Sequence, residues 1–382
     1  MNKAPASKRP VERLVSPGVH IACIRRKGIE EFFITATREG HESPQAMFDH
    51  VASLLQRHAA HPVSQEVFGV PFHGVGEPAL RAAFARTAWP VTWVEENPDN
   101  PNGVGGTHVW AVAGVPVVPF EFDHGVAGCV FEDEFARYGH IGGIVPPDVS
   151  SSPHDQAKAL FQRMQETLHA MDMNFRQVVR TWFYNHDILA WYGPFNTART
   201  AFFDEMDLFH GLVPASTGIG GRNPFGAALT AHALAMRPKR DEVQAVAVPS
   251  PLQCSALEYG SAFSRALEVS ADPAGPTPGY RRLMISGTAS IAPGGNTLYA
   301  GDLDAQVART MDVTEAILRS RGMNWDDVTR AIAYFKDGCR TEAFRNYCAA
   351  RDLTHLPVLC VHQDICRDDL LFELEADAII IQ

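Results

Sequence analysis

Apolar residues recur along the chain at two alternating spacings. From Gln306 to Gly322 they return about every 3.6 residues, which predicts an amphipathic helix that ends at the glycine. A short apolar run at residues 331–335 follows and predicts a strand. The same order of helix and strand recurs from Gln156 to Tyr184, and the two stretches align without a gap. This alignment indicates that one structural unit occurs at least twice.

A third, weaker copy begins at Gln45, and in it Val67 takes the place of Val178 and Val328. Each copy is preceded by a predicted strand and followed by a second helix, a proline and a closing strand. The leading strands are residues 32–36, 140–144 and 283–287, and the prolines are Pro90, Pro214 and Pro357. We therefore expect three tandem β-α-β-α-β units. The alternative is chance similarity between unrelated segments. This alternative is strongest for the first copy, which matches the other two least well.

These copies set the expected organisation of the chain. We expect a disordered tail at residues 1–15, a degenerate first unit at 16–125, a second unit at 126–245 and a third unit at 246–382. A chain of 382 residues is long enough to form several hydrophobic cores.

Composition and charge exclude several classes of function. The net charge of −11, with no dense basic patch, argues against a nucleic-acid partner but leaves room for a small anionic substrate. No apolar run approaches the ~18 residues of a membrane helix, and no secretory signal is recognisable, so we expect no membrane partner and a cytoplasmic location. The seven cysteines form no C-x-x-C pair, which argues against a structural zinc site or a disulfide framework.

Two acidic residues near the C-terminus are candidates for acid catalysis. Glu373 and Glu375 are two residues apart on a predicted strand, so both side chains point to one face. Their apolar neighbours predict desolvation, which raises the pKa of a carboxyl group and suits it to donate a proton. A pair of exposed acids on an edge strand is the alternative. Cys366 precedes them and is either a core thiol or a functional one, with Arg367 able to stabilise a thiolate or an anionic substrate.

The second copy carries the densest cluster of polar and aromatic residues. Arg180, Tyr184 and Arg199 supply cationic and hydroxyl donors for a substrate carboxylate. The alternative places the aromatic rings in the core and the arginines along its surface. The glycine-rich turn at residues 216–222 lacks the lysine of a P-loop, so we do not expect it to bind a nucleotide.

The third copy resembles the Rid (YjgF) family in residues 286–290, Gly301-Asp302, Gln306, Gly322 and residues 372–375. Rid proteins are homotrimers with ligand sites in the clefts between subunits. The resemblance implies an α/β (α+β) fold in which three tandem Rid/YjgF-like (chorismate-mutase-like) units form an intramolecular pseudo-trimer. The three clefts are then free to differ, and by position relative to the proline Glu373 corresponds to Thr230 of the second copy.

A closer resemblance covers the second and third copies, from about Gln156 to the C-terminus. Its motifs are weak one by one and fairly specific as a set. They are Arg180-x-Trp182-x-Tyr184-x-x-Asp187-Ile188, Phe195-Asn196-x-x-Arg199, Thr217-Gly218-Ile219-Gly220, Tyr259 with Phe263-x-Arg265-Ala266, residues 286–290, and Asp364-Ile365-Cys366-Arg367 with Asp369-Leu370-Leu371-x-Glu373. In these motifs the chain resembles the chorismatases, monomeric enzymes with a fold like that of the Rid trimer.

This resemblance implies a reaction and a set of site residues. The acid at Glu373 would protonate the enolpyruvyl ether of chorismate, with loss of pyruvate. Some members give a dihydroxycyclohexadiene carboxylate and others 3-hydroxybenzoate, and Gly287 with Cys366 goes with the latter. The implied substrate-binding residues are Tyr184, Arg199, Thr217, Tyr259, Arg265, Gly287 and Arg367. The resemblance further implies a chorismate-like anionic substrate, no metal, no cofactor, and a monomer, with a weak homodimer as the alternative.

The chain departs from the chorismatases at two positions that usually carry arginine, here Leu252 and the pair Ser261-Ala262. These departures leave another small carboxylate open as the substrate. A second hypothesis is a Rid-like imine or enamine deaminase, although the arginine typical of Rid proteins is Leu359 here. A third hypothesis is a binding module of the same fold without catalysis.

Overall fold

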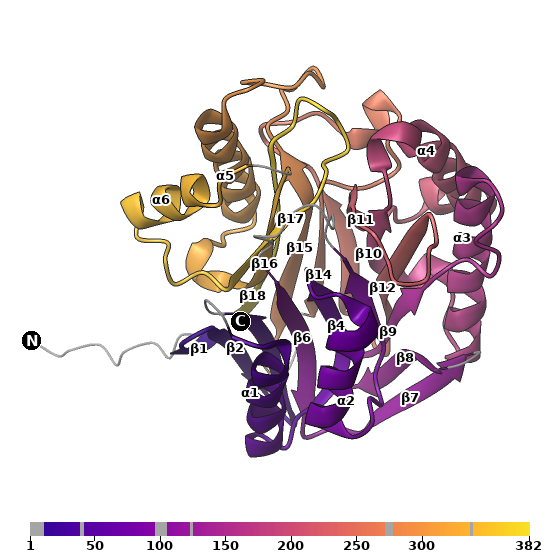
Figure 1. Cartoon of the computed structure of the whole chain (residues 1–382), viewed down its shortest axis with the longest axis vertical. Coiled ribbons are helices and arrows are strands. Elements are labelled where there is room, and N and C mark those ends of the chain that lie inside the picture. Colours follow the sequence, from indigo (N-terminus) through magenta and orange to yellow (C-terminus); the bar gives the residue numbers. More distant parts are fainter. Residues whose placement is uncertain (1–10, 39–41, 96–104, 123–124, 272–277, 337–338) are drawn as a thin grey trace, which may run out of the picture.

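The computed structural model describes residues 11–38, 42–95, 105–122, 125–271, 278–336 and 339–382. Its strands form three six-stranded sheets, each made from one continuous part of the chain. The sheets face a common centre, and the helices lie around them on the outside (Figure 1). None of the helices in these ranges is long and apolar enough to cross a membrane.

Each unit supplies six strands and two helices. The first contains β1 (Val11–Ser16), β2 (Val19–Arg26), β3 (Ile29–Thr37), α1 (Pro44–Arg57), β4 (His61–Phe68), α2 (Glu77–Phe84), β5 (Val91–Val94) and β6 (Gly106–Ala113). The second contains β7 (Val117–Phe122), β8 (Gly125–Glu132), β9 (Ala136–Ile144), α3 (Pro153–Ala170), β10 (Val178–Asn185), α4 (Ile188–Glu205), β11 (Ala215–Gly220) and β12 (Leu229–Pro238). The third contains β13 (Val243–Val248), β14 (Ala266–Ala271), β15 (Tyr280–Ala289), α5 (Leu303–Ser320), β16 (Val328–Phe335), α6 (Glu342–Ala350), β17 (Val358–His362) and β18 (Phe372–Ile381).

All three sheets share one topology. Within each unit the strands lie in the spatial order first, second, third, sixth, fourth and fifth. The fourth and fifth strands run parallel, and the other neighbours run antiparallel. Three repetitions of this uncommon order confirm the predicted α/β (α+β) architecture of three tandem units.

The sheets divide the chain between β6 and β7 and between β12 and β13. The expected boundaries at 125/126 and 245/246 instead fall within β8 and β13, because β7 and β13 are the outermost strands of the sheets that follow. Residues 11–15 of the expected tail belong to β1, which pairs with β2 from Val11 onward. Residues 1–10 lie outside the described residues.

Local capping explains why the second and third copies align so well. Asn174 and Asn324 each cap a short 3-10 turn, and each accepts a hydrogen bond from the backbone two residues on. In both turns the side chain three residues later accepts a hydrogen bond from the backbone N–H of the asparagine. This capping box fixes the path from the helix into β10 and β16.

The first copy is offset from the alignment that the sequence suggested. β4 has a β-bulge between Pro62 and Ser64. β10 and β16 have the same bulge after their first residues, Val178 and Val328, so the three bulges align the three strands. The register therefore places Pro62, not Val67, at the position of Val178 and Val328. Because of this register, Phe68 corresponds to Tyr184 and Tyr334.

The rings at these three corresponding positions meet at the centre of the molecule. The Phe68 ring lies 5.6 Å from that of Tyr184 and 6.5 Å from that of Tyr334, measured between centroids. Each unit has its own core between sheet and helices, and a fourth core joins all three sheets. The pseudo-threefold axis thus passes through a buried apolar centre.

Candidate active site

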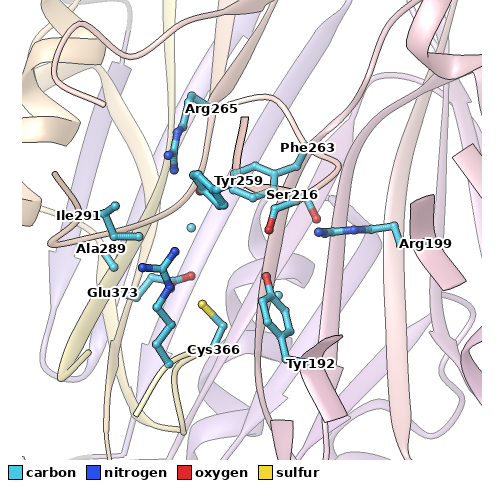
Figure 2. Close-up of a pocket in the computed structure, with 14 residues that line it drawn as sticks. Tyr192, Arg199, Ser216, Tyr259, Phe263, Arg265, Ala289, Ile291, Cys366 and Glu373 are labelled. Carbon is cyan, nitrogen blue, oxygen red and sulfur yellow. The ribbon is translucent and has the colours of Figure 1, made fainter. Parts of the chain in front are cut away.

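One pocket lies in the cleft between the second and third units (Figure 2). Its walls come from α4 and β11 of the second unit and from β15, β18 and three loops of the third. The lining residues are Tyr192, Arg199, Ser216, Gly218, Tyr259, Ser261, Phe263, Arg265, Gly287, Ala289, Ile291, Cys366, Arg367 and Glu373. Seven of the nine residues proposed from the sequence therefore meet in one place.

Glu373 lies on β18 between its partners Tyr334 on β16 and Ala289 on β15. Its side chain is 5% exposed, and the carboxyl group points into the pocket (Figure 2). Across from it, a Cβ atom on Gly287 would lie 2.0 Å from Glu373 Oε1. The carboxyl group thus occupies space that any side chain at position 287 would take.

Glu375 lies two residues further on the same strand face and is also buried. Arg180 and Arg330 donate to its carboxylate at 2.9 and 2.7 Å, and Trp182 Nε1 donates at 3.0 Å. Thr217 donates a fourth hydrogen bond. Although burial alone would raise the pKa of Glu375, the two arginines and these hydrogen bonds lower it below its usual value.

The pKa of Glu373 moves the other way. Burial, followed by the nearby negative charge of Glu375, raises it to about 8, and the more distant Arg180 and Arg265 only partly offset this. At neutral pH, Glu373 is therefore a protonated acid beside an ionised carboxylate. Environments that push the pKa values of two neighbouring carboxyl groups apart are typical of acid–base sites.

Two buried arginines direct guanidinium groups into the pocket from opposite sides (Figure 2). Arg199 Nη2 donates to Asn196 Oδ1 at 2.6 Å, and Arg265 Nε donates to the carbonyl of Cys254 at 2.9 Å. Among the described residues, Arg199 Nε and Arg265 Nη2 are buried without a hydrogen-bond partner. Buried donors in this state are available to an anionic ligand.

Tyr259 closes the pocket between two arginines. The Cζ atoms of Arg265 and Arg367 lie 5.3 and 5.6 Å from the centroid of its ring. The space enclosed by the lining side chains is about 40 Å³, little more than a water molecule occupies in the liquid. A substrate with a six-membered ring is larger than this space. It can therefore enter only if lining side chains such as Tyr259 and Arg367 move aside.

Cys366 lies between Glu373 and Tyr192 in the pocket (Figure 2). Burial, and then the neighbouring Glu373, raises the pKa of its thiol to about 12. The raised pKa favours the neutral thiol, although the charge of Arg367 acts in the opposite direction. Arg367 donates to the carbonyl of Gly295 at 2.6 Å.

Two residues proposed from the sequence lie outside the pocket lining. Tyr184 points to the central axis, where its hydroxyl meets His232 Nε2 at 3.2 Å. Thr217 lies beneath the pocket, where its hydroxyl accepts from Arg180 and from the amide of Gly287 at 2.8 and 3.1 Å. Thr217 therefore links the Glu375 carboxylate to the strand that carries Gly287.

Seven lining residues were not proposed as site residues, namely Tyr192, Ser216, Gly218, Ser261, Phe263, Ala289 and Ile291. Ser216, Gly218, Phe263 and Ala289 stand in the glycine-rich turn and the motifs quoted from the sequence, which was a usable signal. Ile291 carries no such signal. At the positions where an arginine was expected, Ser261 lines the pocket, and Leu252 packs against the core of the third unit.

The acid occurs at one of three corresponding strand positions. The residue paired with Tyr334 is Glu373, the residue paired with Tyr184 is Thr230, and the residue paired with Phe68 is Gly106. The strand register thus gives the same match between Glu373 and Thr230 that the sequence suggested. Among the described residues, no cluster of three His, Cys, Asp or Glu side chains suits a metal ion.

Comparison with known proteins gives relatives of one kind. No protein-family model matches the chain. A chorismatase of Streptomyces hygroscopicus is 28% identical over 254 residues, which cover 62% of this chain and 71% of that protein. A chorismatase of Streptomyces rapamycinicus is 29% identical, with 53% and 64% covered. A 3-hydroxybenzoate synthase of Streptomyces hygroscopicus is 25% identical over 286 residues, 69% of this chain and 80% of that protein.

Solved structures agree in fold. A chorismatase crystal structure superposes with a TM-score of 0.58 and 22% identity, over 83% of this chain and 93% of that one. A Rid-family protein from Yersinia pestis matches over 36% of this chain and its own full length, with a TM-score of 0.29. The chain shares the fold of the chorismatase structure over most of its length. In sequence the chain is similar to chorismatases over more than half of its length.

Proposed function

We propose that this chain converts chorismate by passing a proton from Glu373 to the enolpyruvyl ether, with loss of pyruvate. The observation that carries the proposal is the buried Glu373 carboxyl group, which a pKa of about 8 leaves protonated at neutral pH beside a pocket lined by arginines. The names of the relatives, chorismatase and 3-hydroxybenzoate synthase, support chorismate as the substrate.

The proton goes to the methylene carbon of the enol ether. Protonation there leaves a positive charge shared by the adjacent carbon and the ether oxygen, and the newly formed Glu373 carboxylate stabilises it. Net uptake of one water then gives pyruvate and a dihydroxycyclohexadiene carboxylate. Loss of pyruvate without net uptake of water gives 3-hydroxybenzoate. Either outcome also needs a proton acceptor, for the added water or for the ring hydrogen lost on aromatisation, and the Glu373 carboxylate left by the first step is available for this.

Arg199 and Arg265 hold the two carboxylates of chorismate from opposite walls. Each has a buried donor with no partner among the described residues, so a substrate carboxylate replaces no existing hydrogen bond there. Arg367 and Tyr259 cover the pocket and keep water from the cation. Fixing the enol ether near Glu373 supplies the orientation that proton transfer to carbon needs.

Gly287 and Cys366 favour 3-hydroxybenzoate as the product. The missing side chain at Gly287 lets the carboxyl group of Glu373 lie against the backbone. Cys366 presents a neutral thiol beside this carboxyl group, and a thiol is a weak hydrogen-bonding group that holds water poorly. A pocket that retains little water near the cation suits the outcome without hydration.

The test is to incubate the protein with chorismate and follow pyruvate and aromatic product, for wild type and Glu373→Gln. The proposal expects both products from wild type and almost none from the variant. Turnover of an imine with no turnover of chorismate would support the deaminase hypothesis instead. Retention of a small carboxylate without turnover of either would support the binding module.

A further inference from the structure

A second cavity lies between the third and the first units, in the cleft that corresponds to the active-site pocket. We call it the 3–1 groove. It is lined by His20, Thr37, Arg38, Phe344, Arg345, Asn346, Cys348, Ala349, Leu353, Thr354, Leu356, Val358 and Cys360. Its volume is about 840 Å³, which is within the range of small-molecule sites.

Strand registers show that the 3–1 groove is the internal counterpart of the active-site pocket. In both, one wall is the last parallel strand of a unit and the helix before it, here β17 and α6, there β11 and α4. The opposite wall comes from the third strand of the next unit together with the second strand, in the 3–1 groove, or the residue just before it, in the active-site pocket. The register of each sheet places Val358, Cys360, His20 and Thr37 where the pocket has Ser216, Gly218, Arg265 and Ala289.

The 3–1 groove keeps the shape of the site but not its acid. Gly106 stands at the position of Glu373, and a Cβ atom there would lie 2.3 Å from Leu359 Cδ1. Leu359 therefore fills the place that the carboxyl group occupies in the active-site pocket. A ligand in the 3–1 groove therefore meets no carboxyl group that corresponds to Glu373.

The charge of the 3–1 groove suits an anion. Arg38 comes from the first unit and the exposed Arg345 from the third, and none of the lining residues is acidic. Arg38 Nε donates to the carbonyl of Glu42 at 3.0 Å, which fixes the guanidinium group through one nitrogen. Phe344, Leu353 and Leu356 supply an apolar wall beside these charges.

We propose that the 3–1 groove binds a small organic carboxylate with an apolar body and does not convert it. Two arginines from opposite walls match a carboxylate group, and the apolar wall takes the rest of the ligand. The tandem units of this chain thus provide two ligand sites of related shape, one with a catalytic acid and one without. This inference does not depend on the reaction proposed above, because it rests on residues outside the active-site pocket.

The test uses the full chain and benzoate as the probe, with binding followed by isothermal titration calorimetry. Arg345→Ala and Arg345→Glu remove or reverse a charge on an exposed helix position, so neither should disturb the fold. Arg319→Ala is the matched control, since Arg319 is an exposed arginine on α5 that pairs with Glu315 outside the groove. A carboxylate bound by Arg345 should weaken about tenfold or more in Arg345→Ala and be lost in Arg345→Glu.

Arg345 variants and the Arg319 control that bind benzoate equally would overturn the proposal. So would competition titrations in which inorganic phosphate or phenol binds the groove as tightly as benzoate does, because the first would mean a general anion site and the second an apolar site. Chorismate turnover by Arg345→Ala should remain at the wild-type level. If the protein does not convert chorismate, the benzoate titrations still test the 3–1 groove. Failure of the proposed function and failure of this inference can therefore be told apart.

Discussion

Glu373 and Glu375 lie two residues apart on one face of β18, yet their surroundings drive their pKa values in opposite directions. Arg180 and Arg330 hold Glu375 ionised, while burial and the charge of Glu375 hold Glu373 protonated. The negative charge of Glu375 thereby raises the pKa of Glu373. Glu373 therefore remains protonated at neutral pH in part because of Glu375, a carboxylate that does not line the pocket.

This relationship predicts the pH dependence of turnover. Because Glu373 donates only when protonated, activity should fall as the pH rises through about 8. Glu375→Gln removes the neighbouring negative charge and leaves Arg180 and Arg330, so the pKa of Glu373 should drop and the alkaline limb should move to lower pH. Pyruvate release from pH 5 to 9 checks the shift. An unmoved limb in Glu375→Gln would show that the tuning is absent.

The same substitution should cost stability. Removing one partner of a buried ion pair leaves the other charges uncompensated, which typically costs about 3–5 kcal/mol. The depressed pKa of Glu375 means that its contribution is present above its unfolded pKa and is lost as the pH falls through its lower folded value. Urea unfolding at pH 7 and at low pH should therefore show the difference between wild type and Glu375→Gln shrinking on acidification.

Glu373 should behave in the opposite sense. A carboxyl group with a raised folded pKa binds a proton that the unfolded chain has released, so it lowers stability as the pH rises from about 4.5 to about 8. Glu373→Gln removes this penalty and should be more stable than wild type at pH 8, by an amount of order a few kcal/mol. The two proteins should converge near pH 4. A variant less stable than wild type at pH 8 would mean that Glu373 is a structural residue.

Gly287→Ala should displace the acid. The added Cβ atom would come within 2.0 Å of Glu373 Oε1, so the carboxyl group must turn away. A misplacement of about 1 Å costs on the order of 10²-fold in rate, and we expect pyruvate release to fall by at least tenfold. Gly193→Ala is the control, because a Cβ atom there meets no atom within 4 Å. Equal activity of the two variants would contradict the assigned position of the carboxyl group.

Arginine geometry should appear in the Michaelis constant. Arg199→Lys and Arg265→Lys keep the charge but lose the planar fork that pairs with a carboxylate. We expect KM for chorismate to rise about tenfold or more, with a smaller change in kcat. Arg176→Lys, which changes an exposed arginine away from the pocket, should leave both constants unchanged. A loss in kcat alone would place these arginines at the reacting centre.

Much of the fold could be predicted from the sequence, for reasons visible in particular residues. The second and third copies aligned because Asn174 and Asn324 build the same capped turn before the same strand. The first copy was misplaced by several residues, because its helix α1 has 14 residues where α3 and α5 have 18, and a weak hydrophobic pattern does not reveal this difference in length. The boundaries between units were misplaced because β7 and β13 are the outermost strands of their sheets, which the repeat pattern did not include.

Site residues on strands could be predicted from the alternation of side chains along the strand. Site residues on loops could not be predicted in this way. Glu373 and Glu375 follow from the alternation of β18, and their different environments depend on partners far along the chain, such as Arg180. Tyr184 was assigned to the site because its neighbours are polar, but its ring points to the axis and contacts Phe68. Phe263 and Ile291 reach the pocket from loops, which have no periodic signal to follow.

The most direct measurement is pyruvate release from chorismate at pH 7 by wild type and by Glu373→Gln, with unfolding curves to show that both proteins are folded. A buried carboxyl group that supplies the proton predicts steady pyruvate release from wild type and a loss of about 10²–10⁴-fold in the variant. Chorismate consumed at similar rates by both proteins would contradict the account.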